Sequence, residues 1–304
     1  MNVPGRAAVG ILAALLFGPA AALAKAPARG PVAIVYSLAG EVSLTAPDAA
    51  RRPLRLFDRL AAGTAVEVGP GSRLALAFVN GLRYEMGERS RVRLGPKGLA
   101  SSSGAVRALP RVPPLPCLSS IAAKDRPGVR AGAVRIRGEG IEGIYPGRGA
   151  TALASAVVLR FRNVEGARRY RIEVGDGAGT VVYSTETEST KLSLPADALR
   201  PGMSYHWSVS TMNRPGPMAQ GEAEFTTLDA DTARAREELR LLVEKTGSEE
   251  LTALLAGVDR ELGLLAEARA ELQSALRAAP MDTALAEALT ALERHMEVGL
   301  ASEN

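Results

Sequence analysis

Residues 73–86 read RLALAFVNGLRYEM, two alternating runs joined by Asn80-Gly81. The first run places Leu, Leu and Phe at every second position, and the second places Leu, Tyr and Met in the same way. Side chains of a strand alternate between its two faces, so this pattern predicts one buried face and one face in water. Asn-Gly between two such runs favours a type I′ hairpin turn. We therefore expect a β-hairpin here.

Short strand patterns continue on the N-terminal side of this hairpin. Residues 32–36 (VAIVY) form an apolar run, and residues 41–45 (EVSLT) alternate. Glycines at 63, 69, 71 and 87 mark further turns. Together these signals predict an all-β module over residues 30–97.

This module resembles the FecR domain, a small β-rich extracytoplasmic module. The matching elements are Ala39-Gly40-Glu41-Val42, Leu60-Ala61-Ala62-Gly63-Thr64-Ala65-Val66-Glu67, Gly71-Ser72-Arg73-Leu74-Ala75-Leu76, Asn80-Gly81-Leu82-Arg83-Tyr84 and Gly87-Glu88-Arg89-Ser90-Arg91-Val92-Arg93-Leu94. The resemblance covers about a fifth of the chain. Members that regulate iron uptake carry a cytoplasmic segment and a membrane span before the domain. Only five residues precede Arg6, so we place a FecR-type signalling regulator last among the alternatives.

The N-terminus has the pattern of a secretory signal peptide. Arg6 precedes an apolar run that ends in Ala22-Leu23-Ala24, a small-x-small cleavage site before Lys25. We expect residues 1–24 to be removed and the mature protein to be periplasmic or secreted, with no integral membrane span left. The single cysteine, Cys117, allows no internal disulfide, and we expect it to be a buried structural residue.

Residues 98–150 are rich in Gly, Pro and Ser and are expected to be a connector. Residues 151–228 then show about seven short strand patterns, which predict a β-sandwich. A run within them resembles a fibronectin type III domain through Leu199, Pro201-Gly202, Tyr205, Trp207 and Val209. The resemblance implies that the Tyr205 hydroxyl bonds back to the backbone as a tyrosine corner. We expect Tyr205 and Trp207 to lie in the core and His206 on the surface.

Residues 229–298 change to a helical period, with breaks near Gly247, Gly263 and Pro280. Four helices are expected, with Ser248 and Asp282 as N-caps. One helix pair resembles a tetratricopeptide repeat through Leu255, Ala256, Gly263, Ala268, Leu272, Ala275 and Pro280. Stable arrays of such repeats normally need three or more. This tail therefore either packs as a four-helix unit or docks on a partner.

Charge is unevenly distributed along the chain. Residues 29–110 hold 12 Lys and Arg against 6 Asp and Glu, whereas residues 229–304 hold 8 against 16. The two ends could therefore dock on each other, or the basic end could meet an anionic surface. The arginines are scattered and few aromatic residues lie among them, which argues against nucleic-acid binding. Arg89, Arg91 and Arg93 lie two apart, and we expect them to form a ladder on one strand face.

The motifs of the main enzyme classes are missing from the sequence. It has no H-E-x-x-H, no Cys-x-x-Cys, no G-x-S-x-G and no P-loop. We therefore expect no enzymatic activity, no catalytic residue, no cofactor and no metal. The leading hypothesis is an exported cell-envelope scaffold or adaptor that binds a protein partner. The alternative is a peptidoglycan- or carbohydrate-binding module with Arg89, Arg91 and Arg93 facing the ligand.

Overall fold

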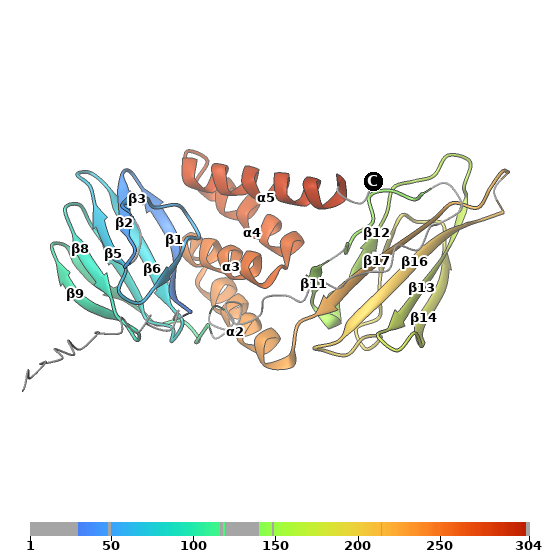
Figure 1. Ribbon diagram of the computed structural model, residues 1–304, viewed down its shortest axis with the longest axis horizontal. Coiled ribbons are helices and arrows are strands. Elements are labelled where there is room, and N and C mark those ends of the chain that lie inside the picture. Colours follow the sequence, from blue (N-terminus) through green and yellow to red (C-terminus); the bar gives the residue numbers. More distant parts are fainter. Residues whose placement is uncertain are drawn as a thin grey trace, which may run out of the picture.

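The computed structural model describes residues 30–47, 50–115, 118, 140–147, 149–213 and 215–301. In this range the chain forms an N-terminal β-sandwich, a second β-sandwich and a layer of helices. Figure 1 shows the helices between the two sandwiches, although they come last in the sequence. The expected signal peptide lies outside the described residues. Among the helices that are described, none is long and apolar enough to cross a membrane.

Two antiparallel sheets form the N-terminal sandwich. Over the described residues each has five strands, in the orders β10-β7-β6-β1-β4 and β3-β2-β5-β8-β9. The strands are β1 (Pro31–Ala39), β2 (Val42–Thr45), β3 (Arg52–Pro53), β4 (Arg59–Ala61), β5 (Ala65–Val68), β6 (Arg73–Phe78), β7 (Arg83–Met86), β8 (Arg91–Leu94), β9 (Leu99–Ser103) and β10 (Val106–Leu109). The facing sides of the sheets share one apolar core, to which Leu76 and Phe78 contribute from one sheet and Val66 and Val92 from the other. The expected all-β architecture of this part is confirmed.

The predicted hairpin is present, with a different turn. β6 and β7 pair in antiparallel register from Leu74↔Met86 to Ala77↔Arg83. Gly81 has a φ of 82°, but Asn80 does not have a positive φ, so the turn is not type I′. The side chain of Asn80 instead accepts from the Leu82 amide and donates to the carbonyl of Lys97.

The connector expected at residues 98–150 begins later than the sequence predicts, because two strands occupy its start. β9 and β10 fall inside it, and they pair with β8 and β7, so each sheet of the N-terminal sandwich gains an edge strand. At its other end, Tyr145 forms a bridge with Arg160 of the second sandwich. The three serines of β9 and the glycines beside it, Gly98 and Gly104, make this stretch of sequence look like a loop.

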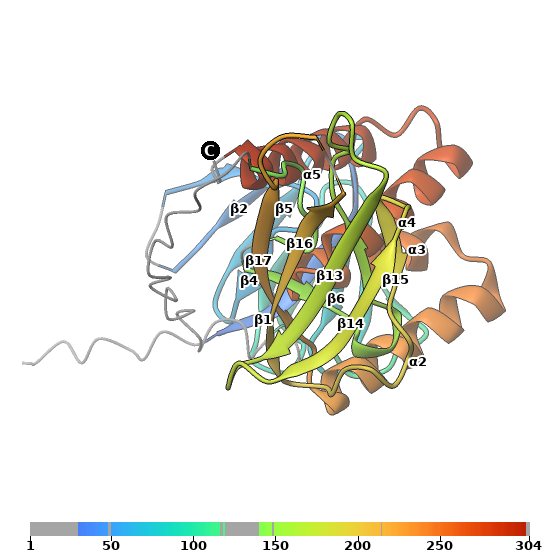
Figure 2. The ribbon, with the colours of Figure 1, turned by 90° about the vertical axis from the view of Figure 1, so that its right-hand side faces the viewer.

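The second sandwich contains seven strands within the described residues. They are β11 (Ala150–Ala152), β12 (Val158–Arg160), β13 (Arg169–Asp176), β14 (Val181–Thr187), β15 (Lys191–Ser193), β16 (Ser204–Met212) and β17 (Gln220–Thr227), with a 3-10 turn η1 (Ala154–Ala156). The sheet β11-β17-β16-β13-β14 packs on the pair β12-β15, and Figure 2 shows this larger sheet facing the viewer. Trp207 and Tyr205 lie in the core, 0% and 4% exposed. The Tyr205 hydroxyl accepts a hydrogen bond from the Arg200 amide at 2.8 Å, which confirms the expected tyrosine corner.

Four helices make up the described part of the tail: α2 (Ala230–Thr246), α3 (Glu249–Leu262), α4 (Leu265–Ala278) and α5 (Thr283–Ala301). Gly247 and Gly263 end α2 and α3 in the left-handed conformation. Ser248 caps α3 by accepting from the Leu251 amide, and Asp282 accepts from the Leu285 amide in the first turn of α5. The predicted helical segment, its breaks and both N-caps are confirmed.

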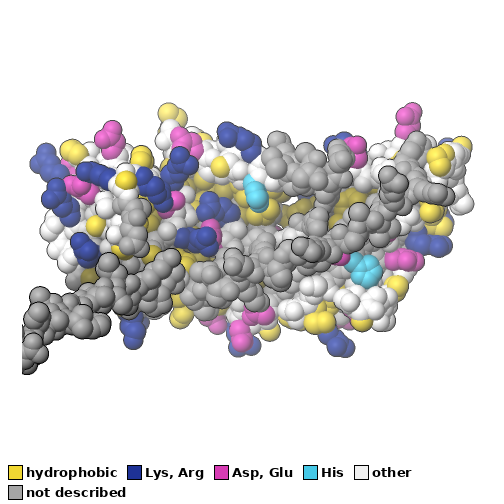
Figure 3. Space-filling view, viewed as in Figure 1, with side chains coloured by type: hydrophobic (Ala, Val, Ile, Leu, Met, Phe, Trp, Pro, Cys, Tyr) yellow, Lys and Arg dark blue, Asp and Glu magenta, His cyan; other side chains and the backbone are white. Residues whose placement is uncertain are grey.

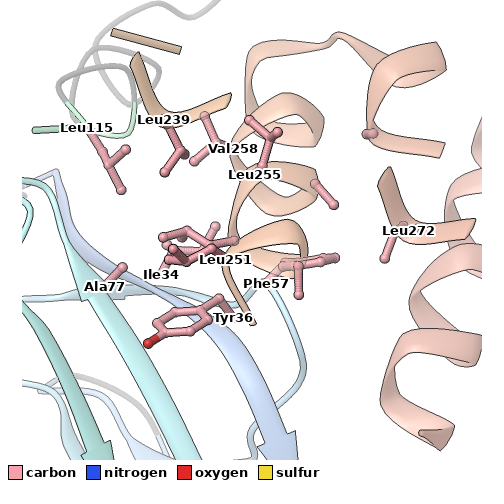
Figure 4. Packing of buried hydrophobic residues seen from close by; sticks show 14 of the residues in the cluster. Ile34, Tyr36, Phe57, Ala77, Leu115, Leu239, Leu251, Leu255, Val258 and Leu272 are labelled. Atoms are coloured by element: carbon pink, nitrogen blue, oxygen red, sulfur yellow. The ribbon is translucent and has the colours of Figure 1, made fainter. Parts of the chain in front are cut away.

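The helices cover the outer face of the sheet that contains β1 and β6. Ile34, Tyr36, Ala75 and Ala77 point away from the sandwich and share a second apolar cluster with α2, α3, α4 and α5. Figure 4 shows Leu251 and Leu255 of α3 above this face. The prediction that the hairpin has one face in water is therefore wrong for β6. Its second face carries small alanines, over which a helix can lie closely.

One contact between the helices and the N-terminal sandwich is very closely packed. Gly257 of α3 lies against Phe57, which has a φ of 65° and is 1% exposed. A Cβ at Gly257 would come within 2.6 Å of the Phe57 ring. Arg260 lies over the same ring and donates to the Phe57 carbonyl at 3.0 Å. Arg59 adds an ion pair to Glu261 at 3.4 Å, so the basic front and the acidic tail do meet.

The helical layer also contacts the second sandwich. Thr151 donates its amide hydrogen to the carbonyl of Gly263, between α3 and α4, at 3.4 Å. Tyr145 has the backbone of Ala266 as a hydrogen-bond partner, and burial raises the pKa of this phenol to about 12. A small hollow of about 200 Å³ separates the two parts beside Tyr145. The tail thus packs as a helical unit between the sandwiches.

Candidate functional site

The three arginines predicted to form a ladder do not all lie on one strand. Arg91 and Arg93 are exposed on the same face of β8. Arg89 precedes the strand, in a turn with a φ of 55°. This turn takes the chain from one sheet of the sandwich to the other, so it cannot continue the alternation of β8. The prediction is therefore wrong for Arg89, and the ladder is limited to Arg91 and Arg93.

A polar row crosses the outer face of the second N-terminal sheet through Arg91. Its members are aligned by strand register: Ser43 of β2 lies opposite Glu67 of β5, Glu67 opposite Arg91, and Arg91 opposite Ser103 of β9. The inward side chains between them fill the sandwich core. The core therefore fixes the positions of these four polar residues.

Glu67 is held between two arginines. Arg91 donates to its Oε1 atom from Nε at 2.9 Å and from Nη2 at 2.6 Å. Arg51 reaches its Oε2 atom at 3.0 Å and also donates to the Ser43 hydroxyl at 2.8 Å. The hydrogen bond from Arg91 holds the pKa of Glu67 below its ordinary value. The carboxylate is therefore ionised over the physiological pH range.

A groove of about 1050 Å³ opens beside this row. Its lining includes four arginines and two glutamates: Arg51, Arg52, Arg89, Arg91, Glu41 and Glu67. Arg52 pairs with Asp58 at 2.8 Å, whereas no ion pair within the described residues reaches Arg89. The groove therefore has a surplus of positive charge. Figure 3 shows Lys and Arg side chains gathered over this sandwich. We call it the arginine groove.

Arg93 does not line the arginine groove. It belongs to the next row of the sheet, opposite Ala65 and Ser101. Sequence reasoning instead missed Arg51, Arg52 and Glu67. The adjacent pair Arg51-Arg52 and the inward–outward pattern of residues 65–68 were visible signals. Only the strand register brings them beside Arg91.

The other candidate residues show no comparable arrangement. His206 is exposed on the outer face of β16 and lies over Gly175 of the neighbouring strand. Tyr205 and Trp207 are enclosed in the core and offer no platform to a ligand. Within the described ranges, no group of three or more His, Cys, Asp or Glu residues could hold a metal ion. Cys117 lies outside those ranges.

No known family and no curated protein matches this chain. Several solved structures match parts of it. A cell surface anchoring domain is 26% identical over 21% of this chain and 86% of its own, with a TM-score of 0.21. CopC from Methylosinus trichosporium OB3b is 23% identical over 30% of this chain and 93% of its own, with a TM-score of 0.24. The FN1–FN3 domains of chicken CNTN1 are 12% identical over 66% and 55%, with a TM-score of 0.24. Structural similarity this low does not support a function. The function is therefore inferred from the residues of this chain.

Proposed function

We propose that this chain is a non-catalytic, exported scaffold of the cell envelope, with FecR-like, fibronectin type III-like and tetratricopeptide-like parts. One observation carries the proposal: the central helices pack on the N-terminal sandwich and also contact the second one. On one side α3 lies on β1, and on the other the loop before α4 accepts a hydrogen bond from Thr151. Such an arrangement links the two sandwiches through the helical layer.

Each outer face is exposed and carries charged side chains, as a binding surface for a hydrophilic partner would. On the N-terminal sandwich, Arg91, Arg93 and Ser101 point outward. On the second sandwich, Arg171 and Glu222 point outward from the five-stranded sheet. Most apolar side chains of the described helical residues already pack within the molecule. We therefore place partner binding on the sheet faces rather than on the apolar side of the tail.

Site-specific photo-crosslinking in the native cell tests this proposal. A photoreactive amino acid is placed in the full chain at Ser101 or at Glu222, one on each outer face, and at the exposed helical position Ala278 as a control. A scaffold should give a discrete protein adduct from at least one sheet face and none from Ala278. Absence of adducts from both sheet positions, or equal adducts from Ala278, would contradict the proposal.

Cell fractionation in the same experiment tests export. A chain that begins at Lys25 and is recovered with the periplasm or the medium supports the expected signal peptide. An uncleaved chain in the membrane fraction would favour the FecR-type signalling regulator instead.

A further inference from the structure

The arginine groove has unused hydrogen-bond donors. A guanidinium has five N–H donors in a planar fork. Arg91 uses Nε and Nη2 on Glu67, and Arg51 uses Nε on Ser43 and Nη2 on Glu67. Their side chains are 74% and 64% exposed. Within the described residues the Nη1 atoms of both arginines, and the whole guanidinium of Arg89, have no partner.

Glu67 shows what kind of group these arginines bind. Its carboxylate lies between two guanidinium groups and is bonded to both of them. Arg–carboxylate contacts of this kind have a defined geometry, which a lysine could not reproduce. Glu67 also restrains the two side chains, so that less conformational entropy is lost when a ligand binds. The site is therefore organised for a further carboxylate.

The remaining lining favours a hydroxyl-rich ligand. Beside the charged groups, the groove presents the hydroxyls of Ser43 and Ser103 and the glycine backbone at 40, 69 and 104. None of the described residues that line it is aromatic, so they offer no surface on which nucleobases would stack. Its volume is large enough for several sugar units. A polymer with both hydroxyls and carboxylates fits this lining better than a nucleic acid does.

We propose that the arginine groove binds an acidic polysaccharide, whose carboxylates contact Arg51, Arg89 and Arg91 and whose hydroxyls contact the serines and the backbone. The site differs from the predicted ladder, because it includes Arg51 and leaves out Arg93. It does not depend on the scaffold role, since a ligand could bind here whether or not the two outer faces hold protein partners.

Binding of polygalacturonate to the purified full chain tests the proposal. Dextran is the neutral polymer, and poly-L-glutamate is a carboxylate polymer without sugar hydroxyls. The double variant Arg51→Gln/Arg91→Gln should weaken polygalacturonate binding about tenfold or more, and Arg89→Gln should weaken it severalfold. Binding should also weaken as salt concentration rises, because ion contacts are screened.

Arg107→Gln is a matched control. Arg107 is 73% exposed and pairs with Glu85 across two strands of the other sheet, much as Arg91 pairs with Glu67. Thermal melting of each variant checks that the fold is retained. The proposal is overturned if Arg107→Gln weakens binding as much as the groove variants, or if dextran binds equally well. It is also overturned if poly-L-glutamate binds as tightly per carboxylate, because the groove would then recognise acidic peptide. Any of these results leaves the crosslinking test of the scaffold unaffected.

Discussion

Arg236 and Asp259 form an ion pair that is almost fully enclosed, with side chains 6% and 0% exposed. Nε and Nη2 of Arg236 donate to the two carboxylate oxygens at 2.9 and 2.7 Å. Burial raises the pKa of Asp259 to about 6, and Arg236 opposes this shift. Arg236 belongs to α2 and Asp259 to α3, so the pair joins these two helices.

We expect Asp259→Leu to lower the free energy of unfolding by about 3–5 kcal/mol, because it leaves a buried guanidinium without a counter-charge. Adding Arg236→Met should restore most of the loss, since an apolar pair of similar size removes the buried charge altogether. Chemical denaturation of the single and double variants measures both effects.

The exposed pair Arg269–Glu293 provides the comparison, at 2.9 Å between the charged atoms. Glu293→Leu should cost less than about 1 kcal/mol, because solvent screens this pair. The double variant Asp259→Leu/Arg236→Met could also prove as unstable as Asp259→Leu alone. That result would show that loss of the ion pair itself, and not the unpaired charge, lowers the stability.

At the scale of elements, β1 explains the apolar run that begins the N-terminal module. Its Ala33 and Val35 face the sandwich core, whereas Ile34 and Tyr36 face the helices. A strand buried on both sides needs a continuous apolar sequence rather than an alternating one. Such a run does not reveal whether its second cover is a sheet or a helix. The element that covers it is α3, about 220 residues further along the chain.

Gly257→Val should destabilise the protein by about 1–3 kcal/mol, because the added methyl groups overpack the contact with Phe57 and Ile34. The matched control is Ala278→Val, which introduces the same side chain at an exposed position of α4. Its cost should be limited to the lower helix propensity of valine, below about 1 kcal/mol. Thermal unfolding measures both. Equal effects at the two sites would mean that α3 does not lie against Phe57 as described.

At the scale of the whole molecule, the tail is part of the N-terminal fold. The helices cover Ile34, Tyr36, Ala75 and Ala77, which would otherwise form an exposed apolar surface. Proteins with such surfaces associate or bind hydrophobic dyes. An experiment that removes the tail to look for lost partners would therefore also damage the N-terminal sandwich. Point variants on the outer faces avoid this problem.

A chain that ends at residue 228 should bind a hydrophobic dye more strongly than the intact chain and unfold at a lower temperature. A second truncated chain with Ile34→Thr and Tyr36→Thr should bind less dye, because the uncovered face is then more polar. Dye fluorescence and thermal unfolding provide the measurements. If the first truncated chain behaved like the intact protein, the helical cover would contribute nothing and the tail would be an independent module.

The sequence by itself determined the parts of this protein. The hairpin at 73–86, the tyrosine corner at Tyr205, the helix ends at Gly247 and Gly263 and the caps Ser248 and Asp282 all depend on residues close together in the chain. Alternation, capping and turn chemistry are local, so a single sequence displays them. The short strands β9 and β10 lack a strong local pattern, so their sequence predicts a connector instead.

The tertiary structure alone decided how the parts join. Phe57 and Arg260 are 203 residues apart, and nothing near either residue predicts their contact. Arg51, Glu67 and Arg91 come together because antiparallel register aligns separate strands, which a ladder drawn along one strand could not reveal. Apolar side chains show that a face of an element must be buried. Because the hydrophobic effect is non-directional, they do not show which other element covers that face. Only the packed chain supplies that partner.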